Sequence, residues 1–401
     1  MGVLAIRGGG GYSRVMKRRF LIFLFALGTV PAEARQAADP AAPPELTAPI
    51  ATMVDVNSGR VLFARDARRR FVPASLTKIM TSYVAFELIA AGKLRLDQRF
   101  VMNPATFRAW HRVGSTMFLE EQSSTTVADL LEGIVTVSAN DGCVVLAEGI
   151  AGSVPGFTAL MNQAARQLGL RDSYFNTPNG WMDQGQTYTS AADLATLATA
   201  LITRHPDLYR RFYGHERAAF NGIEQANHNP LYGHTPGADG VKTGFTGEAG
   251  YGFVGSVVRG TRRIVFVLGG YPRAVERAKE ARAFAEWGFA AWRAQPVAGA
   301  GAVMGTARVQ GGTARTVPLI APRGYDVVVP AGETARYTLS IRYTAPLPAP
   351  IAKGDVVASL IVRAPGQPAV RLPLVAGAAV RAGGVIDRMR DGLVTMAEGG
   401  T

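Results

Sequence analysis

The sequence of 401 residues predicts an α+β domain followed by a small all-β domain. Three observations support this prediction. Hydrophobic residues make up 48% of the chain, which is enough for two cores. The first part mixes helical patterns with strands near its two ends, as α+β domains do. After about residue 295, Val, Thr, Gly and Pro dominate in short alternating runs that are typical of strands.

The first strands and helices are indicated by local turn and cap signals. Strands are expected at Ile50–Val56 and Arg60–Ala64, on either side of the turn formed by residues 57–59, Asn-Ser-Gly. A helix is expected from Ser75 to Ala91, stopped by Gly92. Thr126 with an aspartate three residues later is a capping-box pattern that opens another helix. Further helices are expected near residues 141–151, 156–168, 190–203 and 274–293.

The remaining strands form two groups. The first group closes the α+β domain and consists of Val241–Phe245, Tyr251–Val258 and Arg263–Gly270. The second group predicts an all-β sandwich and consists of Tyr325–Val329, Ala335–Tyr343, Asp355–Val362 and Ala369–Val375. We therefore expect one domain at residues 46–294 and a second at 295–378.

Both ends of the chain have patterns that bear on its location. Three basic residues at 17–19, a short apolar run at 20–30 and Ala-Glu-Ala at 32–34 are typical of a secretory signal. We interpret residues 1–34 as a signal peptide with an upstream extension whose true start is Met16; an uncleaved anchor is the alternative. At residues 383–397, apolar residues recur at helical spacing, which fits either an amphipathic membrane anchor or a frayed tail.

The formal net charge of +13 points to an anionic neighbour, either a membrane surface or a cell-wall polymer. No basic run with interleaved aromatic residues is present, so we expect no nucleic-acid partner. Cys143 is the single cysteine, which excludes an intramolecular disulfide, and we expect it to be buried and inert. The five histidines show no metal-ligand spacing, so neither a metal nor a cofactor is expected.

Ser75 and Lys78 are the first residues that suggest catalysis. Their i, i+3 spacing places them on one face of the expected helix. That helix is apolar nearly all round and is therefore expected to be buried. Burial lowers the pKa of a lysine and makes its neutral amine available as a base for the serine hydroxyl.

Two further motifs follow in the chain. Ser138 and Asn140 lie between two expected helices, where a hydroxyl can relay a proton and a carboxamide can hold an amide; an ordinary helix cap is the alternative. Lys242, Thr243 and Gly244 lie on an expected strand. The lysine and threonine can bind a carboxylate, and the glycine lets a substrate strand approach closely.

The three motifs occur in the order that characterises penicillin-binding proteins and serine β-lactamases. Their context closely resembles the low-molecular-mass D-alanyl-D-alanine carboxypeptidases of the penicillin-binding protein 5/6 family. The resemblance rests on the segments 73–78 (PASLTK), 138–141 (SAND), 175–180 (FNTPNG), 239–244 (DGVKTG) and 249–251 (AGY). It implies a penicillin-binding/β-lactamase-like catalytic domain, with peptidoglycan stem peptides as substrates and β-lactams as covalent inhibitors.

The resemblance also implies a role for each site residue. Ser75 attacks the penultimate D-Ala carbonyl, and Lys78 is its base. Ser138 and Lys242 protonate the leaving amine. The main-chain N–H groups of Ser75 and Phe245 form the oxyanion hole. The substrate-binding residues are Asn140, Thr243, Gly244, Phe245, His228 and Arg277, of which Thr243 binds the terminal carboxylate and Arg277 supports the strand.

Two positions depart from the family pattern. Phe245 stands where close relatives carry histidine, and His228 stands where the family's Asn-Arg-Asn stretch has arginine. The second change affects recognition of the terminal carboxylate. A DD-endopeptidase and a β-lactamase with the same site remain alternatives, as does a non-enzymatic cell-wall scaffold. Because the segment 171–189 contains no glutamate, rapid hydrolysis of penicillin is not expected. We expect an exported, periplasmic protein, with attachment to the outer face of the inner membrane left open.

Overall fold

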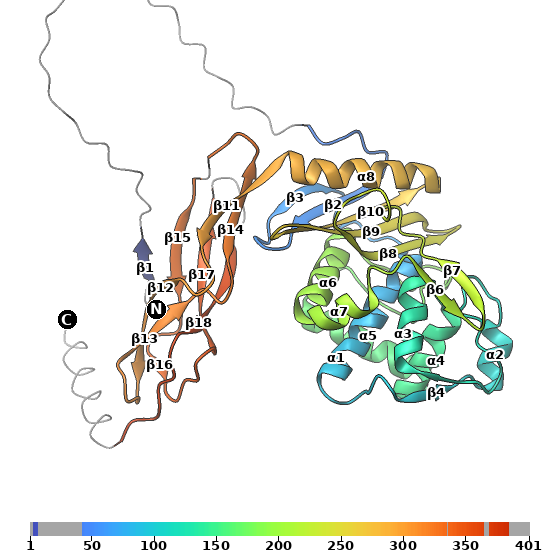
Figure 1. The fold of residues 1–401 in the computed structure, drawn as a ribbon, viewed down its shortest axis with the longest axis horizontal. Helices are drawn as coiled ribbons and strands as arrows, with labels where there is room; N and C mark the ends of the chain where they lie inside the picture. The colour runs from blue at the N-terminus through green and yellow to red at the C-terminus, as the bar shows by residue number, and fades with distance from the viewer. Residues whose placement is uncertain (1–2, 7–41, 335, 365–368, 385–401) are drawn as a thin grey trace, which may run out of the picture. The chain divides into compact units, whose positions relative to one another are not determined.

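The computed structural model describes residues 3–6, 42–334, 336–364 and 369–384 (Figure 1). They fall into two compact units, a larger one at Pro43–Trp292 and a smaller one that contains the rest. The expected secretory signal at 17–34 and the apolar tail at 385–397 lie outside the described residues. Strand β1 (Val3–Ile6) pairs antiparallel with β15 of the smaller unit.

A five-stranded antiparallel sheet organises the larger unit, in the order β3-β2-β10-β9-β8. Its strands are β2 (Ile50–Asp55), β3 (Val61–Arg65), β8 (Ala238–Thr246), β9 (Gly250–Arg259) and β10 (Arg262–Tyr271). Helix α8 (Ala274–Ala290) covers one face and α6 (Ala191–Arg204) packs on the other, as Figure 1 shows. Because β8 is an edge strand, no strand of the sheet pairs with its outer side, where main-chain groups can meet η1, side chains or a ligand.

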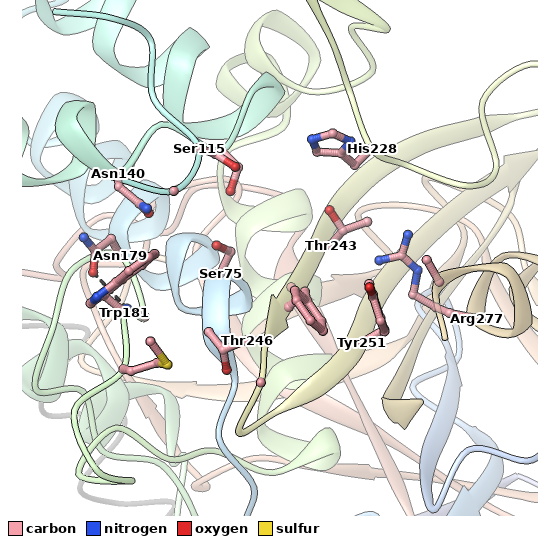
Figure 2. Close-up of a pocket in the computed structure, with 18 residues that line it drawn as sticks. Ser75, Ser115, Asn140, Asn179, Trp181, His228, Thr243, Thr246, Tyr251 and Arg277 are labelled. Atoms are coloured by element: carbon pink, nitrogen blue, oxygen red, sulfur yellow. Dashed lines mark hydrogen bonds between the residues drawn. The ribbon is translucent and has the colours of Figure 1, made fainter. Parts of the chain in front are cut away.

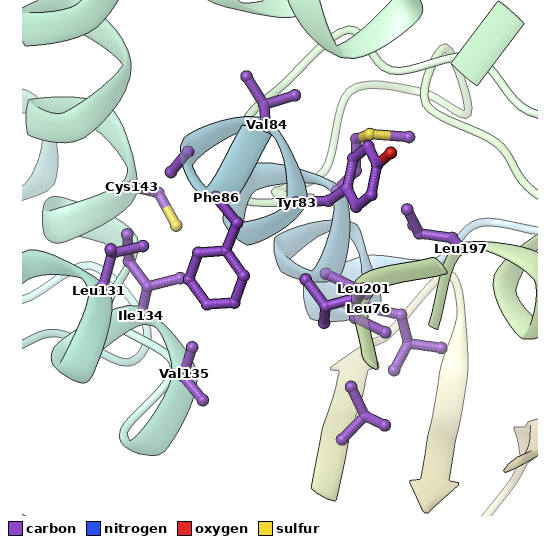
Figure 3. Packing of buried hydrophobic residues seen from close by; sticks show 14 of the residues in the cluster. Leu76, Tyr83, Val84, Phe86, Leu131, Ile134, Val135, Cys143, Leu197 and Leu201 are labelled. Carbon is purple, nitrogen blue, oxygen red and sulfur yellow. The ribbon is translucent and has the colours of Figure 1, made fainter. Parts of the chain in front are cut away.

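Helix α1 (Lys78–Ala90) is the centre of the helical layer. It contacts α3 (Val127–Thr136), α5 (Val154–Leu168) and α6, while α4 (Asn140–Ala151) packs on α3 and α5. Figure 3 shows Phe86 of α1 pointing towards Leu131 and Ile134 of α3. The expected helix start is confirmed, since the Thr126 hydroxyl accepts a hydrogen bond from the main-chain N–H of Asp129 at 3.1 Å. The second bond differs from that of a capping box, because the Asp129 carboxylate accepts from the Thr126 hydroxyl at 2.6 Å. This packing fixes the start of α1, where the candidate nucleophile lies.

The expected helix at 75–91 does not begin as an α-helix. Residues Ala74–Thr77 form a 3₁₀ turn, η1, and α1 follows from Lys78. Several short elements were not expected, because segments of two to seven residues leave little periodicity to detect. They are α2 (Pro104–Trp110), α7 (Pro206–Phe212), β4 (Arg99–Val101), β5 (Ser124–Thr126), β6 (Arg217–Phe220) and β7 (Ile223–Ala226).

The smaller unit is a β-sandwich. Its larger sheet has the order β1-β15-β17-β18-β13-β12-β16, and β11 pairs with β14 in a second sheet. The strands are β11 (Trp292–Ala298), β12 (Val303–Gln310), β13 (Thr316–Ile320), β14 (Tyr325–Pro330), β15 (Thr338–Arg342), β16 (Leu347–Pro348), β17 (Val356–Arg363) and β18 (Val370–Ala376). The helix expected to reach residue 293 was wrong at its end, because α8 stops at Ala290 and strand β11 starts at Trp292.

No single helix in the described part of the chain is both long and apolar enough to cross a bilayer. Helices α4 and α5 would qualify as a pair by length and composition, with a bend of 86° between them. Many of their residues belong to the buried core of the larger unit.

Gly180 is required by the close contact between its loop and η1. It has φ +71°, and a Cβ atom there would lie 1.8 Å from the main-chain oxygen of Ala74. Gly180→Ala should therefore destabilise the protein by more than the positive φ alone costs, which is about 1–2 kcal/mol. Gly169→Ala is the control, because Gly169 has φ +72° and nothing within 4 Å of the added atom. Urea unfolding curves for both variants measure the difference, and equal losses would contradict the clash.

Candidate active site

Ser75 and Lys78 meet at the junction of η1 and α1, as their spacing predicts. Lys78 Nζ donates a hydrogen bond to Ser75 Oγ over 2.7 Å. Two more acceptors surround the same nitrogen, Asn140 Oδ1 at 2.8 Å and the main-chain oxygen of Asn179 at 3.0 Å. The three donors of the ammonium are therefore all used. Loss of one proton would leave two donors for the asparagines and a lone pair facing Ser75.

Burial tunes Lys78 for this role. Its side chain is 1% exposed, and desolvation lowers its pKa to about 8. Electrostatic interactions with Cys143 and Asp141 oppose this shift but do not cancel it. With a pKa of about 8, roughly a tenth of Lys78 is neutral at pH 7, and this fraction can accept the serine proton. Cys143 is buried as expected, and burial raises the pKa of its thiol to about 12, so it stays protonated and inert.

The turn before α4 brings Ser138 and Asn140 to the same place. Ser138 is buried and has φ +65°, an uncommon backbone conformation for a residue with a side chain. Asn140 begins α4, and its Nδ2 donates to the main-chain oxygen of Val113 at 3.0 Å. This bond orients the carboxamide so that its oxygen faces Lys78. Ser138 and Asn140 thus sit on a fixed turn beside the serine-lysine pair.

Strand β8 supplies the third motif. Lys242 is buried, and its Nζ donates to the main-chain oxygen of Thr243 at 3.1 Å. Desolvation lowers the pKa of Lys242 well below its usual value, and the nearby charges of Lys78 and Arg277 lower it further. No direct hydrogen bond joins Lys242 to Ser138 within the residues that the structure describes. The lysine nevertheless lies close enough to Lys78 for their charges to interact.

Gly244 lines the cavity and also permits a close approach of two main chains that the sequence did not indicate. A Cβ atom at this position would lie 2.8 Å from the main-chain oxygen of Pro73 and 3.2 Å from the main-chain nitrogen of Leu76. The glycine therefore lets β8 approach η1, and its expected role towards a substrate strand stays a prediction. This approach brings the main chain of β8 alongside that of the Ser75 turn.

Phe245, Tyr251 and Arg277 form a stack beside β8. The rings of Phe245 and Tyr251 are 4.0 Å apart with an interplanar angle of 22°. The guanidinium carbon of Arg277 lies 5.7 Å from the centre of the Tyr251 ring. Arg277 is 8% exposed, and its Nε is buried without a hydrogen-bond partner. Burial also lowers its pKa. The stack thus positions a guanidinium whose Nε donor is available to an anionic ligand.

These residues surround a cavity of about 560 Å³. Figure 2 shows Ser75 near its centre, with Asn140 and Trp181 on one side and Thr243, Tyr251 and Arg277 on the other. His228 also lines it, and burial together with Lys242 and Arg277 lowers its pKa. No carboxylate is among the lining residues, so the cavity favours an anionic ligand.

The sequence did not single out several residues at this site. Ser115, Asn179, Trp181 and Thr246 line the cavity, and Tyr251 belongs to the Arg277 stack. Asn179 acts through its main-chain oxygen, for which no side-chain pattern exists. Its segment and that of Tyr251 were noted only as part of the family resemblance.

Comparison with known proteins shows to which family the chain belongs. Residues 36–271 match the family model described as D-alanyl-D-alanine carboxypeptidase. The chain belongs to the D-alanyl-D-alanine carboxypeptidase family. Residues 292–382 match a second model, the C-terminal domain of penicillin-binding protein 5. The family resemblance, the α+β fold class with its β-sandwich and the expectation of a serine-type D-Ala-D-Ala carboxypeptidase are thereby confirmed.

The carboxypeptidase relatives match nearly the whole chain. DacA of Haemophilus influenzae is 33% identical over 392 residues, which cover 96% of this chain and 98% of DacA. DacC of Escherichia coli is 34% identical over 92% of each chain. The crystal structure of penicillin-binding protein 5 from Haemophilus influenzae superposes with a TM-score of 0.71 at 33% identity, covering 85% of this chain and 99% of that one.

The pKa of Lys78 predicts how acylation of this carboxypeptidase depends on pH. When the pH falls below the Lys78 pKa of about 8, most of the amine holds its proton, and only the remaining neutral fraction can act as base. The rate constant for acylation by benzylpenicillin should therefore fall about tenfold per pH unit below that value and level off above it. Lys78→Arg should remain folded but lose most acylation at every pH, because arginine stays charged. A rate that is flat from about pH 6 to 9 would show that Lys78 is not the base.

Proposed function

We propose that this carboxypeptidase removes the terminal D-Ala from peptidoglycan stem pentapeptides through an acyl-enzyme at Ser75. The observation that carries the proposal is the Lys78 amine, buried and bonded to Ser75 Oγ at 2.7 Å. Lys78 takes the Ser75 proton, and Oγ attacks the carbonyl carbon of the penultimate D-Ala. The C–N bond then breaks, D-Ala leaves with a proton, and water later hydrolyses the ester.

The remaining roles are those that the family resemblance implies, and the positions of the residues around the cavity support them. The main-chain N–H groups of Ser75 and Phe245 stabilise the oxyanion, since β8 and η1 adjoin at Gly244. Ser138, with Lys242 behind it, delivers the proton to the leaving amine. Asn140 orients the substrate amide. Thr243, His228 and Arg277 bind the terminal carboxylate on the side of the cavity opposite Trp181 (Figure 2).

His228 acts here as a neutral ligand. Its lowered pKa keeps it uncharged at neutral pH, so it offers a hydrogen bond where an arginine would offer a charge. Arg277 then carries most of the charge that recognises the carboxylate.

The same site makes the acyl-enzyme formed with a β-lactam slow to hydrolyse. Asp172 lies 2.6 Å from Arg68 in an ion pair, and Asp183 accepts hydrogen bonds from Thr187. Neither carboxylate lines the cavity. Among the described residues that line the cavity, no acidic group is therefore placed to activate the deacylating water as the glutamate of class A β-lactamases does.

We further propose that the protein is exported to the periplasm and acts next to the inner membrane. This part of the proposal rests on the secretory pattern at residues 17–34 and the apolar spacing at 385–396. The site is compatible with the location, because peptidoglycan peptides are presented outside the cytoplasm.

Benzylpenicillin should label Ser75 covalently, because its strained amide reproduces the acyl donor. Mass spectrometry of the labelled peptide identifies the residue, and a time course of label loss measures deacylation. The wild-type protein should release D-Ala from a stem pentapeptide, and Ser75→Ala should do neither. Label on another residue would contradict the assignment of Ser75 as nucleophile. Rapid turnover of penicillin would contradict the slow deacylation.

Phe245 should affect recognition of the substrate carboxylate through the Tyr251–Arg277 stack. Phe245→Ala removes the ring contact with Tyr251 and should raise KM for a free-carboxylate peptide more than for the matching peptide amide. Phe245→His keeps an aromatic ring and is the matched control. Steady-state kinetics on the two peptides measures the effect. Equal losses on both peptides would show that Phe245 does not position Arg277.

A further inference from the structure

The smaller unit carries three arginines on one face of its larger sheet. Arg342 lies on β15 and pairs with Ser359 of β17. Arg363 lies on β17 and pairs with Thr338 of β15. Arg371 lies on β18 and pairs with Ile361 of β17, whose partner on β15 is Ser340. Residues opposite one another share a face, and so do residues two apart along a strand. Arg342, Arg363 and Arg371 therefore stand on the same face. The intervening row, Ile341, Leu360 and Leu372, lies in the hydrophobic core on the other side.

These arginines have no carboxylate to neutralise them. The three strands contain no Asp or Glu. Among the described residues, none of the three arginines forms an ion pair, and Arg363 only donates to the Ser340 hydroxyl at 3.3 Å. Arg363 and Arg371 are diagonal neighbours, a spacing of about 7–8 Å. Like charges this close repel one another, so an anion bound across them is stabilised.

The face is also hollowed. A cavity of about 570 Å³ is lined by Arg342 and Arg371 together with Tyr343, Thr344, Ser359 and Val356. No carboxylate is among its lining residues. Guanidinium groups bind carboxylates through two parallel hydrogen bonds, and the neighbouring hydroxyls can add more. The cavity is thus suited to a small anionic group that projects from a larger molecule.

Charge is concentrated in this part of the chain. Residues 293–384 contain ten Lys and Arg against three Asp and Glu, whereas residues 43–292 contain 25 against 22. The catalytic unit is therefore nearly balanced. The excess of positive charge in the smaller unit needs an explanation that catalysis does not provide.

We propose that the face formed by Arg342, Arg363 and Arg371 is a second, non-catalytic binding surface for peptidoglycan, which it recognises by the carboxylates of its stem peptides. This inference rests on the proposed function for the identity of the polymer. Binding at a second site raises the effective concentration of the polymer at the catalytic cavity. A soluble peptide with a single stem carries no second stem peptide for the arginine face and gains nothing from it.

A bilayer fits the face less well than a polymer of stem peptides. Peripheral membrane surfaces combine cations with protruding aromatic or leucine side chains. In the described part of the smaller unit, the large hydrophobic residues that are exposed are Val303 and Val356, and neither an aromatic residue nor a leucine is among them. A pendant peptide can also enter the cavity, whereas a bilayer surface cannot.

The test measures binding of the full-length protein to purified peptidoglycan sacculi by co-sedimentation. Ser75→Ala is present in all proteins to prevent turnover. Arg342→Gln with Arg371→Gln should raise the dissociation constant about threefold to tenfold, as expected for the loss of ion pairs made by one half-buried and one exposed arginine. Arg315→Gln with Arg381→Gln is the control, because it removes the same charge from two exposed positions outside these strands. Wild-type affinity should also fall with added salt.

Two further measurements identify the ligand. In the first, the carboxylates of the sacculi are converted to amides. The Ser75→Ala protein should bind these sacculi weakly, with the same affinity that the Arg342/Arg371 variant has for untreated sacculi. Equal binding of the face and control variants would overturn the inference. So would full binding to amidated sacculi, or binding to phosphatidylglycerol vesicles with none to sacculi.

Catalysis is measured in a separate assay of D-Ala release. With Ser75 intact, the Arg342/Arg371 variant should release D-Ala from a soluble pentapeptide at the wild-type rate but more slowly from sacculi; equal rates on sacculi would overturn the proposed benefit of the face. If the wild-type enzyme released no D-Ala while sacculus binding still depended on these arginines, the proposed function would fail and the binding surface would stand.

Discussion

The buried amine of Lys78 is the interaction on which the rest of the site depends. An unpaired ammonium in an apolar interior is unstable, so the protein must either satisfy it or favour its neutral form. This structure does both. Three acceptors from η1, α4 and the loop before Trp181 converge on the nitrogen, while burial lowers its pKa to about 8. The elements that form the active site are thereby tied together at the group that starts the chemistry.

That convergence requires main chains to approach one another closely, and small residues make this possible. Gly180 brings its loop against Ala74, Gly244 brings β8 against Pro73 and Leu76, and Gly114 leaves room for Asn140 and Trp181. A Cβ atom at any of these positions would meet another atom at 2.8 Å or less. The nucleophile is thus held by main-chain packing at Gly180 and Gly244, while Gly114 makes room for two side chains of the cavity wall.

The sequence predicted most of what depends on local spacing. Ser75 and Lys78 are three residues apart, and the apolar character of α1 correctly implied that the lysine is buried. The long helices and the three strands β8, β9 and β10 were predicted to within a few residues, because their hydrophobic patterns are long. Contacts between distant segments were not predictable in this way. The main-chain oxygen of Asn179 reaches Lys78 across 101 residues, and the stack of Phe245, Tyr251 and Arg277 depends on how β8, β9 and α8 pack.

The distribution of charge gives the two units complementary tasks. In the catalytic cavity, cationic groups are buried and few, so each is costly to keep and must face a particular atom of the substrate. On the arginine face of the smaller unit they are mostly exposed and repeated, so each contributes little but together they favour a polymer with many anionic groups. An enzyme that cuts one bond at a time in an extended anionic network benefits from both arrangements. The catalytic cavity discriminates strongly between substrates at the bond that is cut. The arginine face attracts the polymer weakly at several points and so keeps further stem peptides bound to the enzyme.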